Sequence, residues 1–165
     1  MGVIMLESSD KQVLDTKDIA ILEIIQENAT ISNKELAEIL KMSASATHSR
    51  VQNLKERGFI EKTLTVLNRE LLGFDMLCLI HISLHSHNIE QIEEFYKTII
   101  NLNQVLECYH VSGQFDYVLK VAMRNRKELR MFVLEQLTPI PYIATVQTSL
   151  IFEELKFTSS LPLRQ

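Results

Sequence analysis

The sequence has few of the residues on which many catalytic and metal-binding sites depend. Its 165 residues include only four glycines and two cysteines. The glycines are too far apart to form either a GxGxxG dinucleotide motif or a GxxxxGK[ST] phosphate loop. Cys78 and Cys108 have no CxxC spacing and lie in apolar, strand-like segments, so we expect reduced, buried thiols. The sequence therefore predicts no catalytic residues, no bound metal and no cofactor.

Long hydrophobic runs are also missing. The most apolar stretch, MLCLIHISL at 76–84, has 9 residues, far fewer than the ~20 that cross a bilayer. The N-terminus lacks the basic-then-apolar layout of a signal peptide. We therefore expect a cytoplasmic protein that makes no contact with a membrane.

The chain has no overall positive charge. It carries 17 Lys and Arg against 21 Asp and Glu, a net charge of −4. This excludes binding to nucleic acid through the whole surface, so a DNA contact must be local and multiplied by oligomerisation. The length and the 46% hydrophobic content suit one larger or two small globular domains.

Two short amphipathic helices with a tight turn between them are predicted from Asn33 to Gly58. We expect Asn33 to cap the first helix and Ser43 the second, while Gly58 supplies a left-handed residue that ends the pair. The pattern is typical of a helix-turn-helix, whose second helix can lie in the DNA major groove. The inward-facing residues are expected to be Leu36, Ala37, Ile39 and Leu40 in the first helix, and Ala46, Val51 and Leu54 in the second.

Charge placement favours DNA over a helical hairpin with no nucleic-acid partner. Residues 41–62 carry five bases and two acids, whereas residues 14–40 carry two bases and six acids. Arg50 is the strongest candidate for reading a guanine. The full set of candidate DNA contacts is Ser43, Ser45, Thr47, His48 and Arg50 near the bases, with Lys55 and Arg57 at the backbone.

The rest of the N-terminal half completes a small DNA-binding domain. Residues 1–13 show no clear period and are interpreted as an arm. Asp15 is expected to cap a first core helix, which gives a three-helix domain over 14–67. The segment after Gly58 leans toward β structure, so we expect a small wing strand there and then a linker at 68–75.

The pattern changes to alternating strands and helices over 76–165. Its order, β-α-β-β-α-β, predicts a ferredoxin-like domain with both helices on one face of an antiparallel sheet, and the whole chain is assigned to the α+β class. The other face has no cover from the chain itself, so we expect a second copy to bury it. This expectation rests on apolar side chains that occur on both faces of some strands: Leu77, Leu79, Tyr117, Leu119 and Val121.

Three histidines at even spacing, His81, His85 and His87, raise the alternative of a metal site on one strand face. Successive positions on one face are about 6–7 Å apart, too far for three ligands of one ion on a straight strand. We therefore expect no metal there.

Several segments, in order and at the right spacing, resemble the Lrp/AsnC family of leucine-responsive and asparagine-responsive transcription regulators. The resemblance covers roughly residues 14–163 and has the same two-domain layout. The matching segments are LDTKDIAIL, ISNKELAEILKMSASATHSRVQNLKERGFI, LLG, VLECYHVSGQFDYVLKV, IPYIATVQTSLIFEELK and LPL.

This resemblance implies a regulator that binds double-stranded operator DNA, dimerises through its second domain and often forms octamers. It also implies a small-molecule effector, commonly an amino acid, bound between dimers. By motif, the effector residues fall on Gly113, Asp116 and Thr148. Their ordinary roles remain open alternatives: a hairpin glycine, a turn-capping carboxylate and a plain strand residue.

One departure from the family pattern supports an alternative function. Family members often have basic residues where this chain has Gln52 and Asn53. The alternative is an amino-acid-binding oligomeric module that has lost DNA binding.

Overall fold

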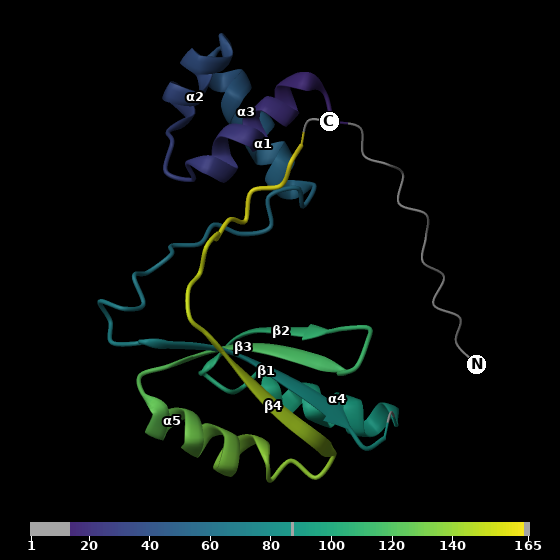
Figure 1. Ribbon diagram of the computed structural model, residues 1–165. Coiled ribbons are helices and arrows are strands. Elements are labelled where there is room, and N and C mark those ends of the chain that lie inside the picture. Colours follow the sequence, from purple (N-terminus) through teal and green to yellow (C-terminus); the bar gives the residue numbers. More distant parts are fainter. Residues whose placement is uncertain (1–13, 87, 164–165) are drawn as a thin grey trace, which may run out of the picture. The chain divides into compact units, whose positions relative to one another are not determined.

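The computed structural model describes residues 14–86 and 88–163. They form two compact units (Figure 1). The helical unit contains the described residues up to Thr65 together with the C-terminal segment from Phe157, and the sheet unit is Val66–Lys156. The predicted arm at 1–13 lies outside the described residues.

Three helices make up the start of the helical unit: α1 (Thr16–Glu27), α2 (Asn33–Leu40) and α3 (Ala44–Glu56). Asp15 and Ser43 cap α1 and α3 as predicted. The predicted cap at Asn33 is wrong by one residue, because the Ser32 hydroxyl accepts the Glu35 N–H while the Glu35 carboxylate accepts the Ser32 N–H. Gly58, with φ of 79°, follows α3 as predicted.

The core of the helical unit is formed by Ile21, Leu36, Leu40, Val51 and Leu54, all buried. Two residues expected to face inward do not. Ile39 is 59% exposed and Ala46 is also exposed, and Thr47 is buried in α3 instead. The predicted three-helix bundle is therefore confirmed, but the orientation of α2 and α3 about their axes differs from the expectation.

No strand occurs in the described segment 57–75, so the predicted wing strand is wrong. Part of this segment is attached to the sheet unit by Arg124. Its guanidinium carbon lies 4.3 Å from the ring centroid of Phe74, and its Nη1 donates to the carbonyl of Leu72 at 2.9 Å. Gly73, at φ of 78°, makes the turn between these two contacts.

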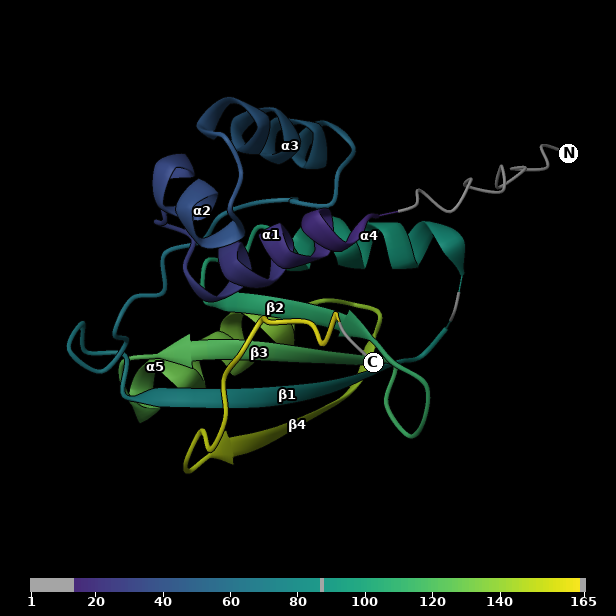
Figure 2. The same ribbon diagram turned by 90° about the horizontal axis from the view of Figure 1, so that it is seen from above.

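The sheet unit contains β1 (Met76–Leu84), α4 (Ile89–Ile99), β2 (Val105–His110), β3 (Tyr117–Met123), α5 (Arg126–Met131) and β4 (Ile143–Ile151). A short π-helix, η1 (Phe132–Leu137), continues α5. The strands pair antiparallel in the order β2-β3-β1-β4, as Figure 2 shows. The predicted ferredoxin-like β-α-β-β-α-β arrangement is confirmed.

The strand register decides which side chains share a face of the sheet. Ile80 pairs with Leu119 and Ile82 with Tyr117, and all four belong to the buried core with Phe95 of α4. Tyr117, Leu119 and Val121 therefore face the helices, and the expectation that they help to make the second face apolar is wrong.

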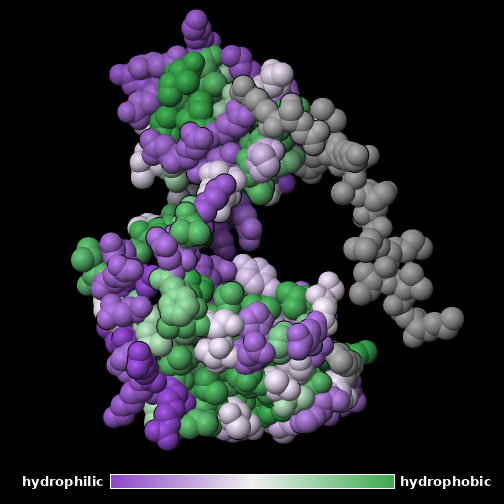
Figure 3. Space-filling model, in the orientation of Figure 1, coloured by the Kyte–Doolittle hydropathy of each residue, from purple (hydrophilic) through white to green (hydrophobic). Residues whose placement is uncertain are grey.

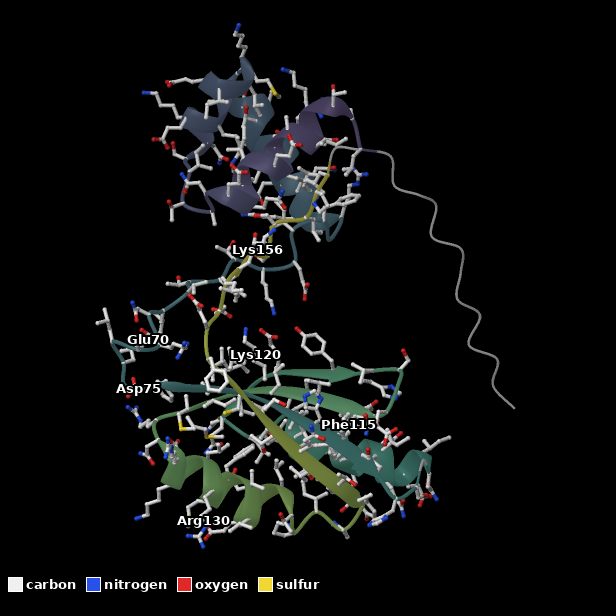
Figure 4. All side chains as sticks on the ribbon, in the orientation of Figure 1. Glu70, Asp75, Phe115, Lys120, Arg130 and Lys156 are labelled. Carbon is white, nitrogen blue, oxygen red and sulfur yellow. The ribbon has the colours of Figure 1, made fainter. Side chains whose placement is uncertain are left out.

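We call the opposite side of the sheet the open face. In Figure 4, Lys120 lies on the side of the sheet opposite α5. Leu77 and Ala122 are already buried in the single chain. From the register, the open face includes Leu77, Leu79, His81, Val118, Lys120 and Ala122.

The two units differ from the predicted limits of 14–67, 68–75 and 76–165 mainly at the C-terminal end. There, Leu161 joins the helical unit through Gln26. The Leu161 N–H donates to the Gln26 Oε1 at 2.9 Å, and the Gln26 Nε2 donates to the Leu161 carbonyl at 3.0 Å. The last described residues therefore pack with helices that are more than 100 positions away in the sequence.

The two cysteines are free thiols in different surroundings. Cys78 is buried as expected, whereas Cys108 is exposed, which corrects the expectation of two buried thiols. Desolvation raises the pKa of both thiols. Over the described ranges, no helix has the length and apolar character needed to cross a membrane.

Candidate nucleic-acid interface and effector site

One side of α3 presents a row of polar side chains to solvent, which we call the outer face of α3: Ser45, His48, Ser49 and Gln52. The spacing i, i+3, i+4, i+7 places them side by side on the helix. The first three are exposed and Gln52 is half-buried, while Thr47, Val51 and Leu54 on the opposite side are buried. Hydroxyl, imidazole and amide groups can all form hydrogen bonds with base edges in the major groove.

Two members of the outer face, Ser49 and Gln52, were not among the predicted DNA contacts. Their spacing of four and seven residues from Ser45 indicates that they lie on the same face of the helix. Gln52 is chemically suited to adenine, because its amide has one donor and one acceptor group that match N7 and N6 of that base. Gln52 is therefore a base-reading candidate in addition to the predicted contacts.

The first turn of α3 is held by local hydrogen bonds. The Ser43 Oγ accepts the Ala46 N–H at 3.2 Å and lies 3.2 Å from the Ser45 Oγ. The Asn33 Nδ2 lies 3.1 Å from the His48 Nδ1. This contact engages one ring nitrogen of His48, and the other, Nε2, can form a hydrogen bond with a base edge.

Thr47 lies on the other side of α3. It is 0% exposed, and its Oγ1 donates to the Ser43 carbonyl at 3.0 Å. The expectation that Thr47 faces solvent near DNA is wrong, because its methyl group is small enough to pack in the core and its hydroxyl is satisfied by the preceding turn.

Arg50 is engaged within the helical unit. Its Nη1 lies 2.6 Å from the Asp15 Oδ2 and 2.6 Å from the Asp18 Oδ1, and so joins α3 to the start of α1. A backbone hydrogen bond from Asp18, followed by the side-chain bond from Arg50, holds the pKa of Asp15 below its usual value of 3.8. The expectation that Arg50 reaches a guanine is not supported, because its guanidinium already binds two carboxylates.

Replacing Arg50 by Gln is expected to destabilise the helical unit by about 1–3 kcal/mol near pH 7, chiefly because the buried Asp18 loses a charged partner. The lowered pKa means that ionised Asp15 stabilises the fold above its ordinary pKa, and that this contribution is lost as the pH falls through the folded-state value. The gap in melting temperature between wild type and Arg50→Gln is therefore expected to narrow below pH 3.8.

Thermal unfolding followed by circular dichroism at several pH values checks this prediction. A variant as stable as wild type at pH 7 would show that the two ion pairs contribute nothing. At a temperature where both proteins are folded, Arg50→Gln is also expected to bind DNA like wild type.

The two predicted phosphate contacts differ in how far the chain restrains them. Lys55 is exposed near the end of α3. Arg57 donates from Nη1 to the Asn53 Oδ1 at 3.2 Å, and its guanidinium carbon lies 4.8 Å from the Phe59 ring centroid. Lys55 can therefore reach phosphate freely, whereas Arg57 would have to give up interactions within the chain.

Two of the predicted effector residues lie near the hairpin between β2 and β3. Gly113 has φ of 134°, a conformation that favours glycine. The Asp116 N–H donates to the Ile82 carbonyl at 2.9 Å, and the Asp116 Oδ2 accepts the Leu84 N–H at 2.7 Å. The carboxylate is thus fixed against the end of β1.

Within one copy of the chain, Thr148 does not lie next to Gly113 and Asp116. It is exposed on the edge strand β4, opposite Ile80 of β1. Because β1 separates β4 from β3, about 9–10 Å of sheet lies between Thr148 and the hairpin. The three predicted effector residues therefore do not form one pocket within one copy.

The structure gives no support to the alternative of a metal site at His81, His85 and His87. The His81 ring packs 5.1 Å from the Phe115 ring, and His87 lies outside the described residues. In the part of the chain that the structure describes, no three His, Cys, Asp or Glu residues are grouped so that they could hold a metal ion.

Comparisons with known proteins agree with both halves of this layout. Residues 14–61 match the family model for winged helix-turn-helix DNA-binding, and residues 77–161 match the model for the Lrp/AsnC ligand binding domain. Transcriptional regulator AzlB of Bacillus subtilis is 37% identical over 92% of this chain and 96% of its own length. The leucine-responsive regulatory protein of Haemophilus influenzae is 33% identical over 96% of both chains.

Solved structures give the same result. A transcriptional regulator from Neisseria meningitidis in complex with L-Met has a TM-score of 0.88 and 29% identity, over 92% of this chain and 97% of its own. Escherichia coli AsnC has a TM-score of 0.82 and 25% identity, over 90% and 98%.

Proposed function

The chain belongs to the Lrp/AsnC family of transcription regulators, and we propose that it binds operator DNA through the outer face of α3 and responds to an amino acid bound by its sheet unit. The proposed DNA binding rests on one observation. A row of polar side chains lies opposite the buried side of α3: Ser45, His48, Ser49 and Gln52. We also propose a cytoplasmic protein without an enzymatic step of its own.

The proposed DNA complex uses the charge distribution of the chain. Base contacts come from neutral side chains on the outer face of α3, and phosphate contacts come from exposed lysines near it, Lys55 and Lys41. Since the net charge is −4, one such contact set gives weak binding. A two-fold dimer supplies the missing affinity, because it presents two α3 helices to the DNA at once. The two half-sites are about 34–36 Å apart or a multiple of that.

The proposed dimer buries the open face of the sheet against that of a second copy. Leu79 and Val118 are half-buried there, beside the buried Leu77 and Ala122. A two-fold interface matches a surface to itself, so a modest apolar patch is buried twice. Assembly of such dimers into octamers, as the family resemblance implies, is part of the proposal.

The proposed effector is an amino acid, held in part by Asp116. A carboxylate with one oxygen fixed by the Leu84 N–H can still accept hydrogen bonds from an α-ammonium group. The similar Neisseria regulator contains L-Met, which supports this ligand class. Because Thr148 is distant within one copy, it joins the site only if another copy supplies it.

Binding of an amino acid is expected to raise the melting temperature and change the particle mass. A ligand at 100 times its Kd stabilises the folded state by about 2.7 kcal/mol. We suggest screening the twenty amino acids by thermal shift with light scattering in parallel. Asp116→Asn is expected to abolish the shift, whereas Glu90→Gln, which removes an exposed carboxylate on α4, keeps it. The absence of any shift or mass change with all twenty would contradict amino-acid sensing.

A module that binds an amino acid without DNA is the second candidate function. It is favoured by one observation: the outer face of α3 contains no lysine or arginine. The salt dependence of DNA affinity separates the two, because its slope reports the number of phosphates that the protein neutralises. A slope near zero would favour the module.

A further inference from the structure

The start of α5 carries an unusual concentration of positive charge. Between Val66 and Lys156 the sequence has eight Lys and Arg against eleven Asp and Glu, and four of the eight bases fall within residues 124–130. Three of them, Arg126, Lys127 and Arg130, we call the basic cluster. It is a local cationic surface on a sheet unit that is acidic as a whole.

The side chains of the basic cluster are accessible and have no anionic partner among the residues that the structure describes. All three residues are exposed. Figure 4 shows Arg130 on the side of α5 turned away from the sheet, and Figure 3 shows strongly hydrophilic surface over the start of this helix. The nearby Glu128 carboxylate instead accepts the backbone N–H of Arg124 at 2.6 Å.

This arrangement works against the stability of the helix. Arg130 is four residues from Arg126 and three from Lys127, and like charges at these spacings destabilise a helix. Arg126 and Lys127 also lie in the first turn, where the helix dipole disfavours cations. A bound polyanion would remove both costs, because it neutralises the three side chains together.

DNA is a better partner for these cations than the acidic helix of another copy. Two of the three carboxylates on α4 already have partners: the Glu93 Oε2 lies 3.9 Å from the Lys97 Nζ, and the Glu94 Oε2 accepts the Tyr142 hydroxyl at 2.6 Å. Phosphates of duplex DNA are regularly spaced and carry one charge per about 1.7 Å of helix axis.

We propose that Arg126, Lys127 and Arg130 form a second DNA contact, which binds the phosphate backbone outside the half-site occupied by α3. This inference rests on the proposed DNA-binding function and extends it to the sheet unit. The contact carries no sequence information, because it is made to phosphate by flexible cationic side chains. It makes affinity depend on the length of the DNA beyond the half-site.

The test compares wild type with the triple variant Arg126→Gln, Lys127→Gln and Arg130→Gln on two duplexes. One duplex holds a single half-site selected by the wild-type protein from random sequence, and the other extends it by several helical turns. Affinities are measured between 50 and 200 mM KCl. On the long duplex we expect the triple variant to bind on the order of tenfold more weakly, with a salt slope smaller by roughly 0.9 for each phosphate that is no longer neutralised.

On the half-site duplex the triple variant is expected to bind like wild type, and Lys97→Gln, which removes a cation already paired with Glu93, is expected to bind both duplexes normally. Normal half-site binding together with unchanged long-duplex binding would overturn the second contact alone. Failure of the wild-type protein to bind the half-site would overturn the proposed function and this inference with it. A lower particle mass in the triple variant would identify the basic cluster as a contact between copies and also overturn it.

Discussion

Replacing Ile21 by Ala is expected to lower the free energy of unfolding of the helical unit by about 2–5 kcal/mol. Ile21 is 0% exposed and lies in the core with residues of α2 and α3. The loss combines the transfer of buried methyl and methylene groups with the cavity left behind. Since a small domain has only about 5–15 kcal/mol of stability in total, this variant is expected to lose DNA binding at temperatures where wild type is still folded.

Ile39→Ala is the matched control, because it makes the same chemical change on a side chain that is 59% exposed. Its effect is expected to stay within about 0.5 kcal/mol. Urea unfolding followed by circular dichroism measures both variants. Equal losses of stability from the two substitutions would mean that α2 is oriented differently from the structure, with Ile39 in the core.

Replacing Gln52 by Glu is expected to weaken operator binding by about 100-fold or more. The substitution keeps the size of the side chain but places a negative charge on the outer face of α3, which in the proposed complex faces the floor of the major groove between two rows of phosphates. It also removes the amide donor that suits adenine N7. Like charges brought together in an interface cost several kcal/mol, and each 1.4 kcal/mol corresponds to a tenfold change in affinity.

Gln91→Glu serves as the control for charge and shape. Gln91, like Gln52, is half-buried on a helix, but it belongs to α4 of the sheet unit. We expect its affinity for DNA to match wild type in a fluorescence anisotropy titration at fixed salt. If Gln52→Glu bound as tightly as Gln91→Glu, the outer face of α3 would not lie against DNA.

Periodicity was enough to predict the order of elements in both units. The alternation in β1 is unambiguous because every second residue from Cys78 to Leu84 is buried by the helices. The caps at Asp15 and Ser43 were also predictable, since a short polar side chain just before an apolar-periodic run is well suited to accept a backbone N–H of the first helical turn. Fold class follows from such local signals because each strand and helix must bury one face.

Tertiary packing determines the features of the helical unit that the sequence did not indicate. In an eight-residue helix such as α2, Leu36, Ala37, Ile39 and Leu40 cover too wide an arc for all of them to be buried, and the sequence does not say which one is left outside. The two acids that bind Arg50 lie 35 and 32 positions earlier in the chain. No local pattern indicates that an arginine in a recognition helix is already engaged there.

The sequence did not indicate the register of the sheet either, because tertiary packing determines it. Tyr117 and Leu119 alternate correctly within β3, but alternation alone does not say which face meets the helices. Their pairing with Ile82 and Ile80 decides it. The distance between Thr148 and Asp116 likewise depends on the strand order, in which β1 lies between β3 and β4.

Photo-crosslinking from Ser45 tests the central claim most directly. A benzophenone amino acid at this exposed position at the start of α3 is expected to crosslink to bases of a bound duplex, whereas the same group at the exposed Ser86 of the sheet unit is expected to leave the half-site bases unlabelled. Crosslinks to half-site bases from Ser86 but none from Ser45, under conditions where both proteins bind the duplex, would contradict the proposed role of α3.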